Sequence, residues 1–155
     1  MKISIITVTF NSIKYIKDCL ASVSEQSHLD IEHIVIDGDS NDGTLLFLQS
    51  KHKQLAATIS EPDRGVYDAM NKGIRIAKGD IIVFLNSDDI YASNSVLSSV
   101  EKEFIEDPYL EACYSDLIYV DAKDISKIKR YVKPGSFHFG AFSRGWCPPP
   151  PNIFC

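Results

Sequence analysis

Short runs of β-branched and aliphatic residues alternate along this chain with stretches of helical periodicity. The apolar runs occupy residues 3–10, 34–36, 57–60 and 81–85, and the helical stretches occupy residues 13–23, 45–49, 66–77 and 93–105. Such alternation predicts right-handed βαβ units, in which each helix packs back onto a parallel sheet. We therefore predict the α/β fold class, with a single domain whose Rossmann-like, mainly parallel sheet is flanked by helices. Two further strands are predicted at 112–120 and 128–132.

Local sequence signals mark the ends of these elements. Asn11-Ser12 precedes the first helical stretch as an N-cap pattern, and Gly79 is predicted to end the helix at 66–77. The tail from 145 to 155 contains four consecutive prolines, Pro148 to Pro151. Because proline cannot donate a backbone hydrogen bond, we expect neither a helix nor a central strand in that tail.

Charge and cysteine content narrow the function classes. The 155 residues carry a formal net charge of −5, which argues against nucleic-acid binding because that needs a basic surface. The four cysteines show no zinc-like spacing, so we interpret them as free thiols in a reducing compartment. No signal-peptide pattern opens the chain, and no apolar run approaches the ~20 residues that span a bilayer. We therefore expect a cytoplasmic location.

Polar and acidic residues follow three of the predicted strands. Asn11 follows the first strand, Asp37 and Asp39 follow the second, and Asp88 and Asp89 follow the strand at 81–85. Because the carboxyl ends of parallel strands meet at one edge of a sheet, we expect a ligand site there. Adjacent carboxylates suit Mg²⁺ or Mn²⁺, although the same residues are also common in simple turns.

The turn after the first strand lacks a phosphate-binding glycine loop. It reads Asn11-Ser12-Ile13-Lys14, which matches neither the dinucleotide-binding GxGxxG pattern nor the GxxxxGK[ST] pattern of a P-loop. Binding of a diphosphate would therefore depend on a metal ion held by carboxylates.

Several motifs follow one another in order along the chain: SIITVTFN at 4–11, VIDGDSNDGT at 35–44, EPDRGVYDAMNKGI at 61–74, AKGD at 77–80 and FLNSDD at 84–89. Together they resemble bacterial family 2 glycosyltransferases with the GT-A fold, particularly the branch used in cell-surface polysaccharide and lipopolysaccharide synthesis. A phosphoacceptor signalling domain would share the parallel sheet and strand-end aspartates, but it does not account for the pattern at 35–44.

The resemblance implies a nucleotide-binding role for one set of residues. Those similar to the family's nucleobase pocket are Thr7, Val8, Phe10, Asn11, Asp37 and Asp39. The segment that resembles the stretch closing over the nucleotide contributes Asp63, Asp68 and Asn71, and Asp68 has the alternative interpretation of an ordinary helix-surface residue.

The Asp-x-Asp motif of the family corresponds here to Asn86-Ser87-Asp88. Asparagine in the first position, where the family has aspartate, removes one negative charge from the motif. The resemblance implies that Asn86, Ser87 and Asp88 contact the nucleotide. It also implies that Asp88 and Asp89 bind a Mn²⁺ or Mg²⁺ ion and lie at the diphosphate.

The family's activity implies a nucleotide-diphosphate sugar as donor, a glycan or lipid-linked acceptor, and an inverting displacement assisted by the metal. Relatives carry the catalytic base after a Pro-Pro-His-Pro stretch. Pro148 to Pro151 resemble that stretch here, with Pro150 at the histidine position, so we expect the base beyond Cys155. Within the chain, Asp116 and Asp121 are weak candidates for the catalytic base.

The resemblance also divides the chain. We assign 1–133 to a nucleotide-sugar-binding domain and 134–155 to an incomplete acceptor-binding segment. The alternative is a nucleotide-sugar-binding module without turnover.

Two surface features suggest partners. The basic run of Lys127, Lys129, Arg130 and Lys133 is either a solvated strand face or a peripheral contact with an acceptor or with the inner face of the plasma membrane. The aromatic residues Phe137, Phe139, Phe142 and Trp146 predict an apolar patch and hence a homo-oligomer.

Overall fold

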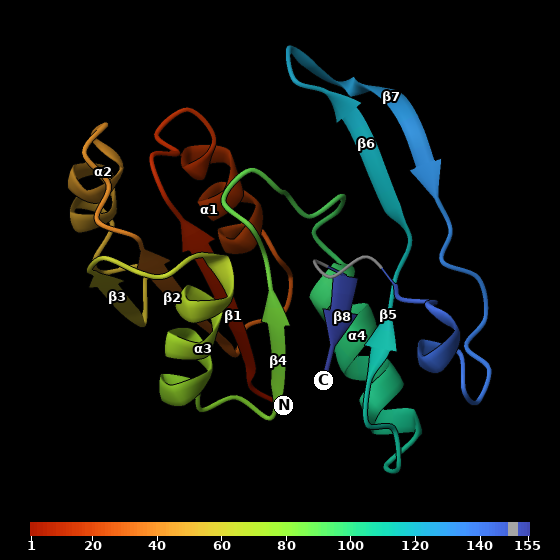
Figure 1. Cartoon of the computed structure of the whole chain (residues 1–155). Helices are drawn as coiled ribbons and strands as arrows, with labels where there is room; N and C mark the ends of the chain where they lie inside the picture. Colours follow the sequence, from red (N-terminus) through yellow and green to blue (C-terminus); the bar gives the residue numbers. More distant parts are fainter. Residues whose placement is uncertain (149–151) are drawn as a thin grey trace.

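The computed structural model describes residues 1–148 and 152–155, and its main sheet has six strands in the order β3-β2-β1-β4-β8-β5 (Figure 1). The strands are β1 (Ile3–Thr9), β2 (Ile31–Asp37), β3 (Ala57–Ser60), β4 (Ile81–Phe84), β5 (Cys113–Tyr114) and β8 (Ile153–Phe154). Strand β1 pairs in parallel with β2 and β4, and β2 pairs in parallel with β3. The predicted mainly parallel α/β sheet is confirmed.

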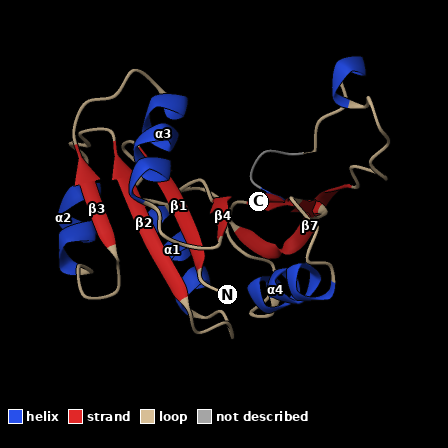
Figure 2. Ribbon diagram, turned by 90° about the horizontal axis from the view of Figure 1, so that it is seen from below, coloured by secondary structure: helices blue, strands red, loops and turns tan. Residues whose placement is uncertain are grey.

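Helices cover both faces of this sheet (Figure 2). They are α1 (Ile16–Ser24), α2 (Thr44–Ser50), α3 (Val66–Ile76) and α4 (Val96–Glu106). On one face Ile6 and Val8 of β1 pack with Ala69 of α3, and on the other Ile3 and Ile5 pack against α1 and α4. All seven residues of β1 are buried, including the polar Ser4, Thr7 and Thr9, which accords with its β-branched and aliphatic sequence.

Two glycines allow close approach of the chain to β1. A Cβ at Gly73 of α3 would lie 2.3 Å from Cγ2 of Ile6, and one at Gly79 would lie 2.6 Å from the amide nitrogen of Ser4. The prediction that Gly79 ends the helix is wrong, because α3 ends at Ile76 and Gly79 does not adopt a positive φ. Packing against β1 is what requires glycine there.

The predicted strand at 112–120 is divided between two sheets. Strand β5 joins the main sheet, whereas β6 (Leu117–Asp121) pairs only with β7 (Asp124–Val132) in a separate two-stranded ribbon. The amide of Ser115 donates to the carbonyl of Asn152, and the Asn152 side chain donates to the carbonyl of Asp116. The returning tail therefore holds the chain at the break between the two strands.

The expectation that the tail contains no central strand is also wrong. Strand β8 lies between β4 and β5 and runs antiparallel to both. Its residues follow the prolines, so their amides remain available, and Phe154 is buried in the core. Pro149 to Pro151, including Pro150 at the family's histidine position, lie outside the described residues.

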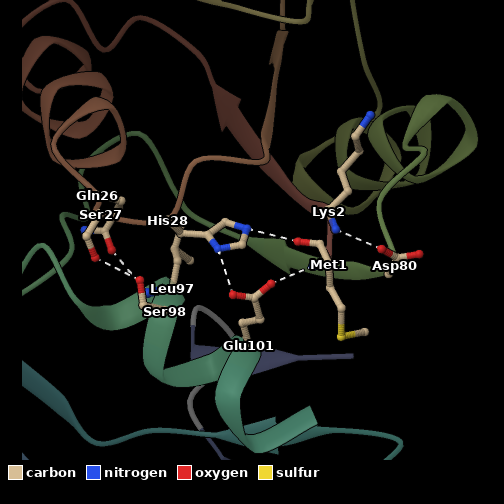
Figure 3. A network of polar contacts seen from close by, with 9 residues as sticks. All are labelled: Met1, Lys2, Gln26, Ser27, His28, Asp80, Leu97, Ser98 and Glu101. Carbon is tan, nitrogen blue, oxygen red and sulfur yellow. Dashed lines mark hydrogen bonds and ion pairs between the residues drawn. The ribbon is translucent and has the colours of Figure 1, made fainter. Parts of the chain in front are cut away.

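Polar contacts tie the amino edge of the sheet to α4 and to the segment that follows α1 (Figure 3). The Met1 ammonium and Nδ1 of His28 both contact the Glu101 carboxylate, and Nε2 of His28 lies 3.0 Å from the Met1 carbonyl. The Leu97 amide donates to Oε1 of Gln26 at 3.1 Å. Within the described residues, no helix combines the length and the apolar character needed to span a membrane.

Candidate functional site

The loops after β1, β2 and β4 meet at the carboxyl edge of the sheet (Figure 1). The Gly38 amide donates to the Thr9 carbonyl, which continues the β1–β2 ladder past the strand ends. Beyond this point the backbone turns sharply, since Asn11 has φ 50° and Asp39 has φ 67°. Asparagine and aspartate tolerate this left-handed conformation better than most residues do.

Reciprocal hydrogen bonds join the first two loops. The Asn11 amide donates to Oγ of Ser40 at 2.8 Å, and the Asn41 amide donates to Oδ1 of Asn11 at 2.9 Å. The predicted N-cap role of Asn11-Ser12 is wrong, because α1 begins at Ile16 and lacks a side-chain cap. Both residues instead bond to neighbouring loops.

Asp37 organises the second loop from below. Its carboxylate accepts hydrogen bonds from the Ser40 hydroxyl, the Ser40 amide and the Ser60 hydroxyl at 2.5, 3.0 and 2.6 Å. The residue is fully buried. Asp39 is exposed one step further along the same turn. Asp37 therefore supports the loop, while Asp39 is presented to solvent.

Asp42, which sequence reasoning did not select, connects the second loop to the first. Its carboxylate accepts from the Ile13 amide at 3.0 Å and from the Thr44 amide and hydroxyl at 3.0 and 2.6 Å. The Thr44 hydroxyl bond and these amides lower the pKa of Asp42. An aspartate two residues before a threonine favours an Asx-turn, in which the carboxylate accepts from the amide two residues on, and this signal could have identified Asp42.

The third loop presents Asp88 at the surface. The Asn86 side chain donates to Oδ2 of Asp89 at 3.0 Å, and the Asp89 amide donates back to the Asn86 carbonyl at 3.0 Å. The Ser87 hydroxyl donates to the Ser12 hydroxyl at 2.9 Å. Asp88 is exposed, whereas partial burial raises the pKa of Asp89, with the Asp88 charge acting in the same direction.

A buried polar chain lies beneath this third loop. The Cys19 thiol contacts the Asn86 carbonyl at 3.5 Å, and the Thr7 hydroxyl lies 4.0 Å from the thiol and 2.9 Å from Nε2 of His33. Burial raises the pKa of Cys19 to about 12 and lowers that of His33 to about 4. Thr7 and Val8 are buried, so the structure places their side chains under the edge.

Phe10 and Asp63 converge over Gly38. A Cβ at Gly38 would lie 2.7 Å from Oδ2 of Asp63 and 3.4 Å from Cδ2 of Phe10. The Phe10 ring is 62% exposed despite its apolar character. Oδ1 of Asp63 accepts from the Gly65 amide at 2.8 Å, which holds the loop that leads into α3.

The first two turns of α3 carry the remaining predicted residues. The Asp68 carboxylate accepts from the backbone amide and the guanidinium of Arg64, and these bonds lower the pKa of Asp68. Asn71 is exposed one turn further along the helix. Asp68 thus serves the structure of the loop before α3, which accords with its interpretation as a helix-surface residue.

A sequence profile described as glycosyl transferase family 2 matches residues 4–149. The chain belongs to glycosyl transferase family 2. An uncharacterized glycosyltransferase of Mycobacterium tuberculosis is 41% identical over 97 residues, which are 62% of this chain and 37% of that protein. A PGL/p-HBAD biosynthesis glycosyltransferase of the same organism is 34% identical over 119 residues, 74% of this chain and 46% of that protein. The chain thus spans less than half the length of these two curated family members.

Solved structures of glycosyltransferases share the fold. S. aureus TarS (residues 1–349) in complex with UDP-GlcNAc matches with a TM-score of 0.64 and 28% identity over 68% of this chain and 32% of that chain. The mannosyltransferase PcManGT from Pyrobaculum calidifontis in complex with GDP-Man and Mn²⁺ matches with a TM-score of 0.67 and 26% identity. This match covers 81% of the chain and 37% of PcManGT. The predicted GT-A fold is confirmed.

The carboxylates of the third loop have the chemistry expected for a metal ion in this family. No group of three or more His, Cys, Asp or Glu side chains in residues 1–148 and 152–155 is arranged to hold a metal by itself. Asp88 and Asp89 nevertheless offer oxygen ligands at an exposed strand end, and Mg²⁺ commonly takes one or two carboxylates together with substrate phosphates. Asp88 and Asp89 therefore fit a cation whose remaining ligands are oxygens of a bound diphosphate.

Two hollows that are open to solvent lie at the opposite edge of the sheet. One of about 240 Å³ lies between the end of α1 and the start of β2, and one of about 480 Å³ lies between the end of α3 and the starts of β2 and β3. Neither contains a predicted site residue. The predicted site residues therefore lie at the opposite edge of the sheet from both hollows.

Proposed function

We propose that this chain binds a nucleotide-diphosphate sugar at the carboxyl edge of β1, β2 and β4 and transfers the sugar to a glycan or lipid-linked acceptor. One observation carries the proposal: hydrogen bonds between loops hold the polar loop after β1 and the acidic loops after β2 and β4 in a single array. The nucleotide sugars named for TarS and PcManGT support the choice of donor.

The nucleotide would lie along the edge from Phe10 to Asp88. The exposed Phe10 ring offers an apolar face for the base, and Asp63 beside it offers hydrogen-bond acceptors. Asn11, Asp39 and Asn71 are exposed and would border the nucleotide. We assign Asp37 and Asp42 the role of fixing the loops. Loops that are already fixed can position a ligand with little loss of conformational entropy on binding.

Asp88 and Asp89 would hold the diphosphate end through a Mn²⁺ or Mg²⁺ ion. Such a cation neutralises charge that develops on the leaving nucleoside diphosphate. Asn86 orients the Asp89 carboxylate, which leaves Asp88 to face the ligand. We propose an inverting displacement, in which a base takes the proton of the acceptor hydroxyl as that oxygen attacks the anomeric carbon.

Calorimetric titration of UDP and GDP, each with and without Mn²⁺, tests this assignment. We expect metal-dependent binding that Asp88→Ala weakens at least tenfold, because the cation loses an oxygen ligand. The matched control is Asp30→Ala, which removes an exposed aspartate at the amino edge and should leave affinity unchanged. Equal binding by wild type and Asp88→Ala would contradict the site.

A nucleotide-sugar-binding module without turnover is the second candidate. The two carboxylates considered as substitute bases are engaged elsewhere, since Asp116 accepts from the Tyr131 hydroxyl at 2.8 Å and Asp121 pairs with Lys129 at 2.7 Å. Release of nucleoside diphosphate from a donor that calorimetry shows to bind separates the two candidates. Saturable binding without release in the presence of acceptor glycans would favour the binding module.

A further inference from the structure

The β6–β7 ribbon, residues 117–133, carries a charge opposite to that of the rest of the chain. It contains five basic and two acidic side chains, a net charge of +3, whereas the whole chain carries −5. The remaining residues therefore carry −8. A positive element on an acidic protein attracts anionic partners locally even though the overall charge repels them.

The ribbon extends from the body of the protein on the side to which the carboxyl ends of β1 and β4 point (Figure 1). It pairs with no other strand in the described part of the chain. Seven consecutive residues of β7, from Ile125 to Tyr131, are exposed. A two-stranded ribbon is marginally stable alone in water, so a surface that covers one face would stabilise it.

Apolar and basic side chains lie next to one another on both faces of this ribbon. Residues paired across an antiparallel ladder point to the same face, which places Ile118 with Tyr131 and Val120 with Ile128. The Lys133 ammonium lies over the Tyr131 ring at 5.5 Å. On the other face the Arg130 guanidinium lies over the Tyr119 ring at 5.9 Å.

The acidic groups of the ribbon are already paired. Asp121 contacts Lys129 at 2.7 Å and Asp124 contacts Lys127 at 3.2 Å. Asp116, at the base of the ribbon, accepts the Tyr131 hydroxyl. Within the described residues no carboxylate forms an ion pair with Lys123, Arg130 or Lys133, so these three cations carry the excess positive charge.

We propose that the β6–β7 ribbon docks on the anionic surface of a lipid bilayer. Lys123, Arg130 and Lys133 would contact the phosphate-bearing headgroups. Ile128 and Tyr131, which share one face of the ribbon and are both more than half exposed, would enter the interface between headgroups and acyl chains, and the long Arg130 side chain would reach the headgroups from the opposite face. This surface does not depend on the proposed glycosyl transfer, although it would bring the carboxyl edge of the sheet near lipid-linked molecules.

Vesicle co-sedimentation of the full chain tests the proposal. We expect partitioning onto phosphatidylcholine vesicles that contain phosphatidylglycerol, little partitioning onto phosphatidylcholine alone, and release as sodium chloride is raised. Substituting Lys123→Gln, Arg130→Gln and Lys133→Gln together should reduce partitioning roughly 100-fold, since each basic side chain near an anionic surface contributes about fivefold.

A matched control changes the same number of charges elsewhere. Lys14, Lys17 and Lys51 also lie over aromatic rings, those of Tyr15 and Phe47, but on the side of the molecule that carries α1 and α2. The triple variant Lys14→Gln, Lys17→Gln, Lys51→Gln should retain partitioning. Thermal unfolding of both variants establishes that each is folded at the assay temperature.

Four results would overturn the proposal. Equal loss in both triple variants would mean that net charge alone governs adsorption. Equal binding to neutral vesicles would indicate nonspecific apolar adhesion. Absence of vesicle binding by the wild type would exclude the membrane directly. A ribbon variant that changes the mass measured by light scattering without wild-type vesicle binding would assign the ribbon to contact between copies of the chain.

Discussion

The carboxyl-edge loops and the β6–β7 ribbon both contain many polar side chains, but they use them differently. In the loops, side chains bond to backbone groups about 30 residues away, as between Asn11 and Ser40 or Ile13 and Asp42. In the ribbon they bond to nearer partners, from two residues away, as between Asp121 and Lys123, to 15 residues away, as between Tyr131 and Asp116. Long-range bonds make the loops part of one cooperative unit with the sheet, whereas local bonds leave the ribbon independent.

Replacement of Asp37 should have the largest effect. Asp37→Ala removes the acceptor of three buried or partly buried donors, so we expect a loss of roughly 3–5 kcal/mol in the free energy of unfolding. Urea denaturation measures this loss. Asp39→Gly, in the exposed part of the same turn at φ 67°, should change stability by less than about 1 kcal/mol. Similar losses in both variants would show that burial of Asp37 does not organise the loop.

Acidification should lower the free energy of unfolding through the buried His33. Burial holds its pKa at about 4 in the folded chain, against 6.5 for the free side chain, so protonation favours the unfolded state. The stabilisation from the neutral His33 side chain is fully present above pH 6.5. As the pH falls toward 4, the free energy of unfolding declines by about 3 kcal/mol in total.

Denaturation profiles of His33→Gln and wild type across this pH range provide the measurement. The variant should show a shallower decline, while His52→Gln, at an exposed histidine, should reproduce the wild-type slope. Identical slopes in wild type and His33→Gln would remove His33 from the acid response.

The thiol beneath the third loop should have an intermediate effect. Cys19→Ala removes the donor to the Asn86 carbonyl, and we expect nucleotide affinity to fall about fivefold, equivalent to about 1 kcal/mol. Cys19→Ser keeps a donor and should restore most of that affinity. Calorimetry reports affinity, and thermal unfolding reports stability. Reduced stability with unchanged affinity would assign Cys19 to packing alone.

Ribbon substitutions should have the smallest effect on stability. Ile128→Ser changes an exposed side chain that lies outside the core, so the free energy of unfolding should change by less than about 0.5 kcal/mol. Hydrogen exchange should be faster at β7 amides than at β1 amides. A loss comparable to that of Asp37→Ala would mean that the ribbon belongs to the same cooperative unit as the sheet.

The sequence predicted the elements that local physics specifies strongly. The run from Ile3 to Phe10 is rich in β-branched and aliphatic residues, which is typical of a strand buried on both faces, and β1 is such a strand. The helical spacing at 66–77 predicted α3, and the order of strands and helices predicted the parallel sheet. The acidic residues that follow the strands were also predicted to meet at one edge, and they do, because parallel strand direction brings those ends together.

Only the tertiary structure decided which polar residues are buried and which strands pair. Asp37 and Asp88 each follow a buried strand, yet Ser40 and Ser60 enclose Asp37 while Asp88 remains exposed. The position of β8 between β4 and β5 depends on pairing with residues far away in sequence. Periodicity and composition report the preferences of short segments, whereas burial and strand pairing depend on the neighbours that folding brings together.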